Sequence, residues 1–202
     1  MCVPTVTYSS INRIEGPYKA LRYPEFIYKG LSIRSIDPGD IEAIRCWRNA
    51  QMDVLRQAAE ISAVEQIAYF KTHVWPEKIT DTPRQILFVL EQENILVGYG
   101  GLVNVDWGSR RAEVSFLLDD KLEENSEIRS AIFESFLKLM QIVGFDELKL
   151  DRLFTETYAI RTRHINTLEA AGFVLEGILR QHVTINGQKV NSLIHGMIES
   201  DR

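Results

Sequence analysis

Residues 98–107 read Gly98-Tyr99-Gly100-Gly101-Leu102-Val103-Asn104-Val105-Asp106-Trp107, and residues 111–118 read Arg111-Ala112-Glu113-Val114-Ser115-Phe116-Leu117-Leu118. The turn-forming residues 107–109 join the two runs, which predicts two antiparallel strands. Alternation places Glu113, Ser115 and Leu117 on one face of the second strand. An acidic loop over residues 119–126 follows, and then a long amphipathic helix. This strand–loop–helix order decides the fold.

The chain on either side of this stretch predicts a mixed α+β domain. Strands are expected within 31–36, 85–91, 95–105, 111–118, 153–157, 173–183 and 189–198, and helices near 41–52, 63–74, 126–143 and 161–171. Ser62 and Glu65 form a capping-box pattern, and Asn186-Gly187 is typical of a type I′ hairpin. The order is β-α-α-β-β-β-α-β-α-β-β. It predicts a mostly antiparallel, twisted sheet of about six to seven strands flanked by about four helices.

Length and charge limit the class of protein. The 202 residues fit one domain, 29–202, preceded by an arm, 1–28. The arm is either anchored by its aromatic residues or a partly disordered tail; those residues are Tyr18, Tyr23, Phe26 and Tyr28. The net charge of −5 provides no general attraction to nucleic acid or to an anionic membrane, so neither is an expected partner.

Cysteine use and hydropathy indicate the compartment. Cys2 and Cys46 form no disulfide framework, so a reducing cytoplasm is expected. The first residues lack the features of a secretory signal, and no stretch approaches the roughly 20 apolar residues of a membrane span. No metal site is expected, because the histidines are scattered and unpaired with cysteine: His73, His164, His182 and His195.

Three local motifs resemble one family. Residues 168–174, Leu168-Glu169-Ala170-Ala171-Gly172-Phe173-Val174, are similar to the LExxGF end of the fourth helix in the GNAT superfamily of N-acetyltransferases. Glu176-Gly177 resembles the EG pair of the branch that acetylates ribosomal-protein N-termini. Arg45-Cys46-Trp47-Arg48-Asn49 resembles the WRN motif of members that include amino-sugar acetyltransferases. The element order over residues 30–198 is similar to the GNAT fold as well.

The resemblance implies direct transfer of an acetyl group from acetyl-CoA, as co-substrate, to a primary amine. Glu113 stands where many members place a general base; a surface ion pair with Arg110 or Arg111 is the alternative. Tyr158 is a candidate proton donor to the leaving thiolate, or else a packed core tyrosine. His164 is a candidate acid or pantetheine ligand, or else a helix-capping or surface residue.

Residues that bind the pantetheine arm are carried over in the same way. The resemblance implies backbone contacts from Phe116, Leu117 and Leu118, at the end of the strand. Arg161 falls where the family's fourth helix usually has asparagine, and Asn166 lies nearby, off the expected register. Both are candidate cofactor ligands.

The pyrophosphate-binding segment departs from the family pattern. Residues 119–126 are acidic and lack the glycine pair that lets backbone N–H groups approach a diphosphate. Ser126 and Arg129 are the candidate ligands that remain. The acidic residues alternatively stabilise the start of the helix through its dipole.

The acceptor pocket is expected near the first helix. Aromatic and polar side chains suit a sugar or a nucleotide, and five residues are candidates: Trp47, Arg48, Asn49, Gln57 and Trp107. Core packing is the alternative for both tryptophans.

The leading hypothesis is an acetyl-CoA-dependent N-acetyltransferase whose acceptor is a small-molecule amine, for example a nucleotide-linked amino sugar, or a protein N-terminus. The missing glycine pair motivates a second hypothesis, a catalytically degenerate GNAT-fold protein that binds a ligand or a partner. An unrelated α+β binding module is the third. Exposed strand edges are compatible with a homodimer.

Overall fold

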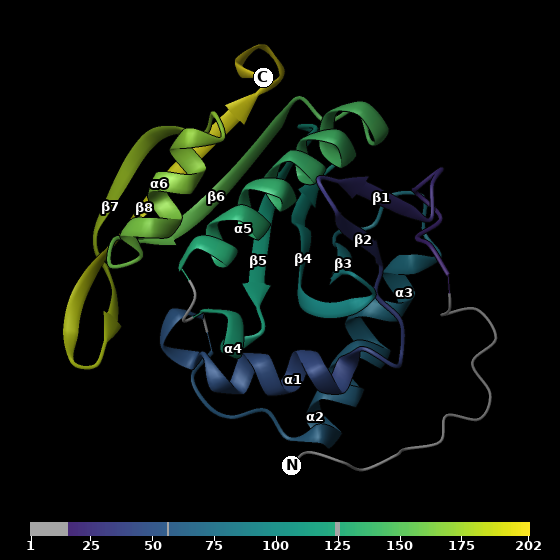
Figure 1. Cartoon of the computed structure of the whole chain (residues 1–202), viewed down its shortest axis with the longest axis horizontal. Helices are drawn as coiled ribbons and strands as arrows, with labels where there is room; N and C mark the ends of the chain where they lie inside the picture. The colour runs from purple at the N-terminus through teal and green to yellow at the C-terminus, as the bar shows by residue number, and fades with distance from the viewer. Residues whose placement is uncertain (1–15, 56, 124–125) are drawn as a thin grey trace.

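A computed structural model describes residues 16–55, 57–123 and 126–202. Its centre is one eight-stranded sheet with the order β1-β2-β3-β4-β5-β6-β8-β7 (Figure 1). The strands are β1 (Glu25–Tyr28), β2 (Leu31–Ser35), β3 (Ile86–Gln92), β4 (Ile95–Asp106), β5 (Arg111–Leu118), β6 (Arg152–Tyr158), β7 (Val174–Ile185) and β8 (Gln188–Ile198). Only β5 and β6 pair in parallel among these strands. The predicted α+β class with a mostly antiparallel sheet is confirmed.

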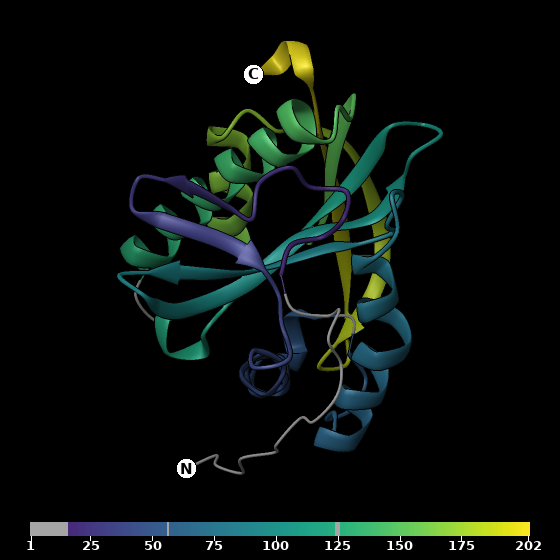
Figure 2. The ribbon, with the colours of Figure 1, turned by 90° about the vertical axis from the view of Figure 1, so that its right-hand side faces the viewer.

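Helices cover both faces of the sheet, as the perpendicular view in Figure 2 shows. One face carries α1 (Ile41–Ala50), α2 (Ala63–Tyr69), the π-helical turn η2 (Phe70–Val74) and α3 (Trp75–Lys78), with the 3-10 turn η1 (Met52–Val54) after α1. The other carries α5 (Ser126–Gln141), its π-helical extension η3 (Ile142–Glu147) and α6 (Thr162–Ala170). The short helix α4 (Asp120–Glu123) precedes α5, and the 3-10 turn η4 (Glu199–Asp201) ends the chain.

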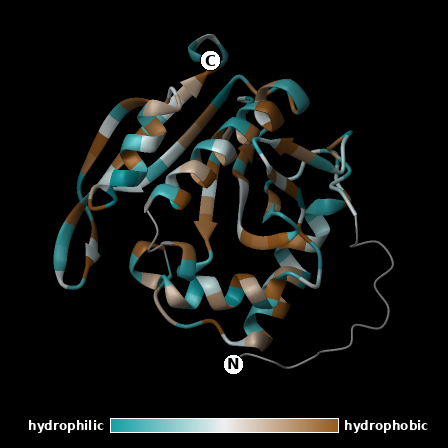
Figure 3. Ribbon diagram, in the orientation of Figure 1, coloured by the Kyte–Doolittle hydropathy of each residue, from teal (hydrophilic) through white to brown (hydrophobic). Residues whose placement is uncertain are grey.

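Two hydrophobic cores lie on opposite faces of the sheet. Val114, Phe116 and Leu118 of β5 belong to the core under α5, whereas Leu117 belongs to the core under α1. This is the alternation that the sequence predicts for this strand. Figure 3 shows hydrophobic residues along the central strands between the helical layers.

The expected arm contributes to the sheet. Residues 25–28 form β1, which pairs antiparallel with β2, so the sheet has one strand more than the sequence predicts. Tyr18 is fully buried, and its hydroxyl oxygen accepts a hydrogen bond of 3.1 Å from the Leu87 backbone N–H. Phe26 is also buried, whereas Tyr23 is 55% exposed. Burial of aromatic area holds residues 18–28 on the domain.

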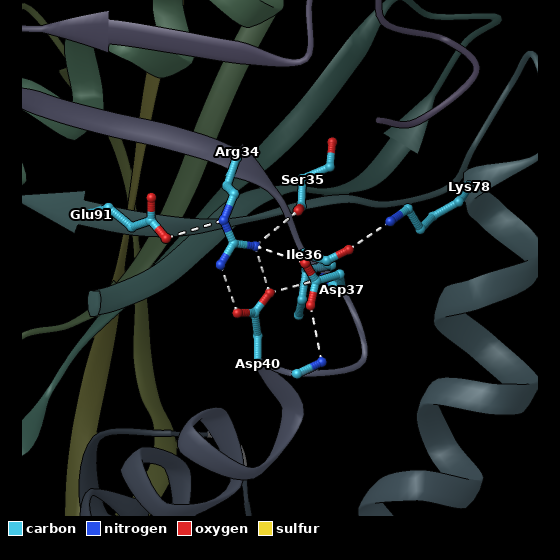
Figure 4. Close-up of polar contacts among 8 residues, drawn as sticks. Arg34, Ser35, Ile36, Asp37, Asp40, Lys78 and Glu91 are labelled. Carbon is cyan, nitrogen blue, oxygen red and sulfur yellow. Dashed lines mark hydrogen bonds and ion pairs between the residues drawn. The ribbon is translucent and has the colours of Figure 1, made fainter. Parts of the chain in front are cut away.

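An ion-pair cluster sets the direction in which α1 leaves the sheet (Figure 4). The Arg34 guanidinium donates to both carboxylate oxygens of the buried Asp40, at 2.8 and 2.9 Å, and to Glu91 at 3.1 Å. The Lys78 ammonium donates to the Ile36 carbonyl at 2.6 Å. A bidentate pair has a defined geometry, so these contacts orient the helix that presents Arg48 to the sheet.

Candidate active site at the opening between β5 and β6

The two central parallel strands separate part-way along their length. Their pairing runs only from Arg111↔Arg152 to Glu113↔Phe154, after which β5 and β6 diverge. A cavity of about 230 Å³ lies at this opening, lined from β5, β6, α5 and α6. An unpaired stretch of strand edge beside a cavity offers backbone donors and acceptors to an extended ligand.

The edge of β5 presents alternate residues to this opening. The Arg110 carbonyl accepts from the Asp151 N–H at 2.7 Å. Because backbone groups alternate along a strand, the N–H and C=O groups of the even-numbered residues of β5 point toward the β6 side. The backbone groups of Phe116 therefore face the opening. The Leu118 carbonyl accepts a hydrogen bond of 2.8 Å from the Gln51 side chain, and Leu117 packs in the core under α1. Of the three predicted strand residues, Phe116 has the backbone placed for a ligand.

Glu113 lies in the lining of this cavity, at the last paired position of β5. It is 9% exposed, and its Oε2 accepts a hydrogen bond of 2.7 Å from the Asn104 amide. The amide contact orients the carboxylate, because Asn104 on β4 lies beside the strand that carries it. A positioned, nearly buried carboxylate can accept a proton from a bound amine.

The end of β6 supplies two hydroxyl groups. Tyr158 is buried and lines the cavity together with Arg161, the residue that precedes α6. Thr157 also lines it and is 3% exposed, and its hydroxyl has no hydrogen-bond partner among the residues that the structure describes. A buried hydroxyl without a partner costs free energy unless a ligand satisfies it. The sequence alone does not point to Thr157, because a threonine in a β-strand is an ordinary strand residue.

His164 lines the cavity, and Arg129 of α5 contacts it. His164 is 5% exposed and stacks on Phe133 with a centroid distance of 4.0 Å. Arg129 Nη2 lies 3.3 Å from His164 Nδ1. A guanidinium only donates, so Nδ1 accepts and the neutral ring carries its hydrogen on Nε2. Burial, followed by the charges of Arg161 and Arg129, holds the pKa of His164 well below its ordinary value.

A second cavity of about 440 Å³ opens on the α1 side of the sheet. Arg48, Val103 and Ser115 line both cavities, so the two meet at these residues. The Arg48 guanidinium donates to the Tyr99 hydroxyl at 2.8 Å and to the Gln57 side-chain oxygen at 3.1 Å. Two cavities that share a wall at an arginine can bring two different substrates together there.

Asn49 holds the loop that closes the second cavity. Its side-chain N–H donates to the Ile61 carbonyl at 2.9 Å, and its oxygen accepts from Gln57 and from the Ile61 N–H, both at 2.9 Å. Ile61 and the preceding residues line the cavity. Asn49 and Gln57 therefore support the wall through hydrogen bonds within the protein.

The other predicted residues lie outside both cavity linings in the described part of the chain. Trp47 is buried in the core under α1. Trp107 lies at the far end of β4, where its indole N–H donates to the Pro83 carbonyl at 2.8 Å. Asn166 is exposed on α6, and Arg129 is 6% exposed beside His164. Ser126 begins α5, but its side chain lies outside the described residues.

A family model described as the acetyltransferase (GNAT) domain matches residues 33–194. The chain belongs to the GNAT acetyltransferase family. The family resemblance of the sequence is thereby confirmed. No curated protein matches the chain.

Solved structures share this GNAT fold. Spermidine N-acetyltransferase from Vibrio cholerae in complex with CoA and spermine matches with a TM-score of 0.74 and 19% identity, over 86% of this chain and 98% of that chain. A dodecameric structure of the Vibrio cholerae enzyme in an intermediate state matches with a TM-score of 0.71 and 19% identity, over 86% and 96%. At this identity the likeness shows the fold.

The acidic segment of this GNAT domain forms a helical turn. Asp119 starts α4, because its carboxylate accepts from the Lys121 N–H at 3.0 Å and its carbonyl accepts from the Leu122 N–H at 3.0 Å. The loop that the sequence predicts here is therefore wrong over residues 120–123. The backbone N–H groups of a helical turn that lack a partner within the helix lie at its N-terminal end. A diphosphate bound to this GNAT domain therefore needs hydrogen-bond donors other than a glycine-rich loop.

Metal ligands do not cluster in the described part of this GNAT domain: no group of three or more histidine, cysteine, aspartate or glutamate side chains there could hold an ion. That the reaction uses no metal stays a prediction. No helix within the same ranges is long and apolar enough to cross a membrane.

Proposed function

We propose that this GNAT domain transfers an acetyl group from acetyl-CoA to the primary amine of a small molecule. The observation that carries the proposal is the meeting of the two cavities at Arg48, Val103 and Ser115. The opening between β5 and β6 takes the pantetheine arm along the Phe116 backbone, and the cavity beside α1 takes the acceptor.

The transfer requires two proton movements. The neutral amine nitrogen attacks the thioester carbonyl carbon, and as the bond forms it loses a proton to Glu113, directly or through water. A C–N bond forms, the C–S bond breaks, and the thiolate that leaves takes a proton. Tyr158 is the proposed donor of that proton, and the neutral ring of His164, which carries its hydrogen on Nε2, is proposed to donate a hydrogen bond to the pantetheine or to the leaving sulfur.

The sequence motifs and the solved structures suggest different acceptors. The amino-sugar and ribosomal-protein branches, which the WRN and EG motifs suggest, point to a nucleotide-linked amino sugar or a protein N-terminus. The solved structures with the same fold are named for spermidine. All three are primary amines that the proposed chemistry can acetylate, so each belongs in the test panel. We place the protein in the cytoplasm and propose a homodimer, because β7 is a long, exposed edge strand.

One observation favours a second candidate function, binding without efficient transfer. The helix α4 and its acidic residues stand where the family has a glycine-rich pyrophosphate loop. Weak attraction for the diphosphate would reduce affinity for the co-substrate. In this case the cavities would serve a ligand that is not acetylated.

Binding of acetyl-CoA tests the proposal first. Thermal unfolding is measured with acetyl-CoA and with equal concentrations of ATP as the control. A ligand that binds only the folded state adds about 2.7 kcal/mol at a hundredfold excess over its dissociation constant, so the midpoint should rise. Thiol release is then measured with the amine panel. Binding of acetyl-CoA without turnover of any amine supports the second candidate. If acetyl-CoA does not shift the unfolding midpoint, both the proposed co-substrate and the proposed transferase activity are refuted.

A further inference from the structure

Arg48 is a half-buried cation with neutral partners at the point where the cavities meet. Its guanidinium donates to the Tyr99 hydroxyl at 2.8 Å and to the Gln57 amide oxygen at 3.1 Å. One turn earlier on α1, Arg45 pairs with the Glu42 carboxylate at 2.7 Å. No carboxylate lies within ion-pair distance of Arg48 among residues 16–55, 57–123 and 126–202. A partly desolvated guanidinium without a counter-ion favours an anionic ligand.

The cavity beyond Arg48 is shaped for an apolar body. Its volume is about 440 Å³, and its sheet and helix walls include Ile44, Phe70, Leu87 and Val103. Such walls suit an aliphatic or aromatic group, while Gln66 and Gln85 add polar groups to the lining.

The carboxylates of this cavity lie at its exposed side. Glu60 and Glu65 are both exposed, and the Glu65 carboxylate already accepts from the Ser62 N–H and hydroxyl at 2.8 and 2.7 Å. These two carboxylates therefore do not compensate the charge of Arg48 at the inner end of the cavity.

Tyr99 adds a second donor beside Arg48. Its oxygen accepts from Arg48, which leaves the hydroxyl hydrogen to donate to a ligand oxygen. Burial raises the pKa of Tyr99, so the hydroxyl keeps this hydrogen at neutral pH. A carboxylate can accept from both groups at once.

We propose that the acceptor is an α-amino acid, or another amine with a carboxylate one or two bonds away, that carries an apolar or aromatic side chain. Arg48 and Tyr99 bind the carboxylate at the junction of the cavities. The neighbouring amine then lies at the Ser115 side, toward the cavity that contains Glu113, and the side chain fills the apolar chamber. This inference rests on the proposed function and names its acceptor class.

Matched amines test the inference without altering the protein. Acetyl transfer is measured for L-phenylalanine against 2-phenylethylamine and for L-leucine against 3-methylbutylamine, with spermidine and a nucleotide-linked amino sugar alongside. We expect kcat/KM to favour the amino acid of each pair at least about tenfold, because removing its carboxylate leaves polar groups of the site without partners. Equal rates within the pairs, or turnover restricted to spermidine or the amino sugar, overturn the inference.

Variants then assign the preference to Arg48. Arg48→Gln should raise KM for the amino acids and remove the preference within each pair, and Tyr99→Phe should reduce it. Arg84→Gln removes an exposed arginine outside both cavity linings and serves as the charge-matched control. The acetyl-CoA-dependent thermal shift of each variant shows that it is folded.

Two other results would refute either the role of Arg48 or the proposed function. An equal loss of kcat for every acceptor with Arg48→Gln would place the guanidinium at the reacting carbonyl and overturn its role in acceptor recognition. If the unaltered protein does not bind acetyl-CoA, the proposed function itself is refuted. This outcome differs from a failure of the acceptor assignment, in which acetyl-CoA still binds.

Discussion

Glu113 illustrates how a single side chain is prepared for proton transfer. Its carboxylate is nearly buried, lines the cavity at the opening between β5 and β6, and is oriented by the Asn104 amide at 2.7 Å. If it accepts the amine proton, Glu113→Gln should lower kcat about 10²- to 10⁴-fold, because glutamine keeps the shape and a hydrogen bond but cannot act as the base. Steady-state thiol release measures this.

Glu134→Gln is the matched control, because Glu134 is an exposed carboxylate on α5 that pairs with Lys29 at 3.1 Å. It should leave kcat unchanged. A Glu113→Gln protein with normal kcat and normal thermal stability would show that another group or bulk water removes the amine proton.

His164 makes folding stability depend on pH. Its pKa is held below the ordinary value chiefly by burial, so below about pH 6.5 the unfolded chain binds a proton that the folded protein does not. Stability should therefore fall as pH falls from about 6.5, by up to about 1.4 kcal/mol per pH unit. Urea unfolding of the wild type and of His164→Gln between about pH 7 and pH 5 measures the slope, which should be shallower in the variant.

His73→Gln provides the comparison, because His73 is an exposed histidine on η2. It should keep the wild-type slope. An unchanged slope in His164→Gln would assign the acid sensitivity of folding to other groups.

At the scale of elements, the glycines of β4 allow the sheet and α5 to approach each other. A Cβ at Gly100 would meet the Ser115 carbonyl oxygen and lie 2.8 Å from Phe136 Cζ of α5. Gly100→Ala should lower the free energy of unfolding by at least about 2 kcal/mol, because neither the backbone nor the packed ring can move freely. Chemical denaturation of the variant measures the loss.

Gly177 on β7 is the control for this change. An added Cβ there meets nothing within 4 Å. Gly177→Ala should change stability by less than about 0.5 kcal/mol. Equal effects of the two substitutions would mean that the close packing at Gly100 does not limit stability.

Several elements are confirmed because their signals are local. Ser62 and Glu65 form the predicted capping box at the start of α2, and Phe173 packs in the core directly after Gly172, whose φ of 95° ends α6. The WRN motif is different. Its tryptophan packs in the core, while Arg48 and Asn49 bind Tyr99, Gln57 and Ile61, partners that no sequence spacing identifies.

At the scale of the whole molecule, the sheet joins both parts of the site. The strand β5 presents Glu113 and the Phe116 backbone to the first cavity, while β4, α1 and the loop to α2 line the second, where we propose that the acceptor binds. The first described residues contribute as well, since Tyr18 and Phe26 are buried against the sheet. The site therefore depends on segments from most of the chain.

The sequence by itself determined the α+β class, most of the element order and the family, because residue periodicity, capping residues and turn glycines act over a few positions; it missed β1 and α4. It also predicted roles for Glu113, Tyr158, His164 and Arg48, which the structure brings together in the lining of one cavity; their roles stay predictions. Only the tertiary structure decided that β5 and β6 separate after Glu113, that Thr157 faces the opening, and that Arg48 lies between two cavities. These features arise from pairing and packing between residues far apart in the chain, where strand register and burial decide which side chains meet.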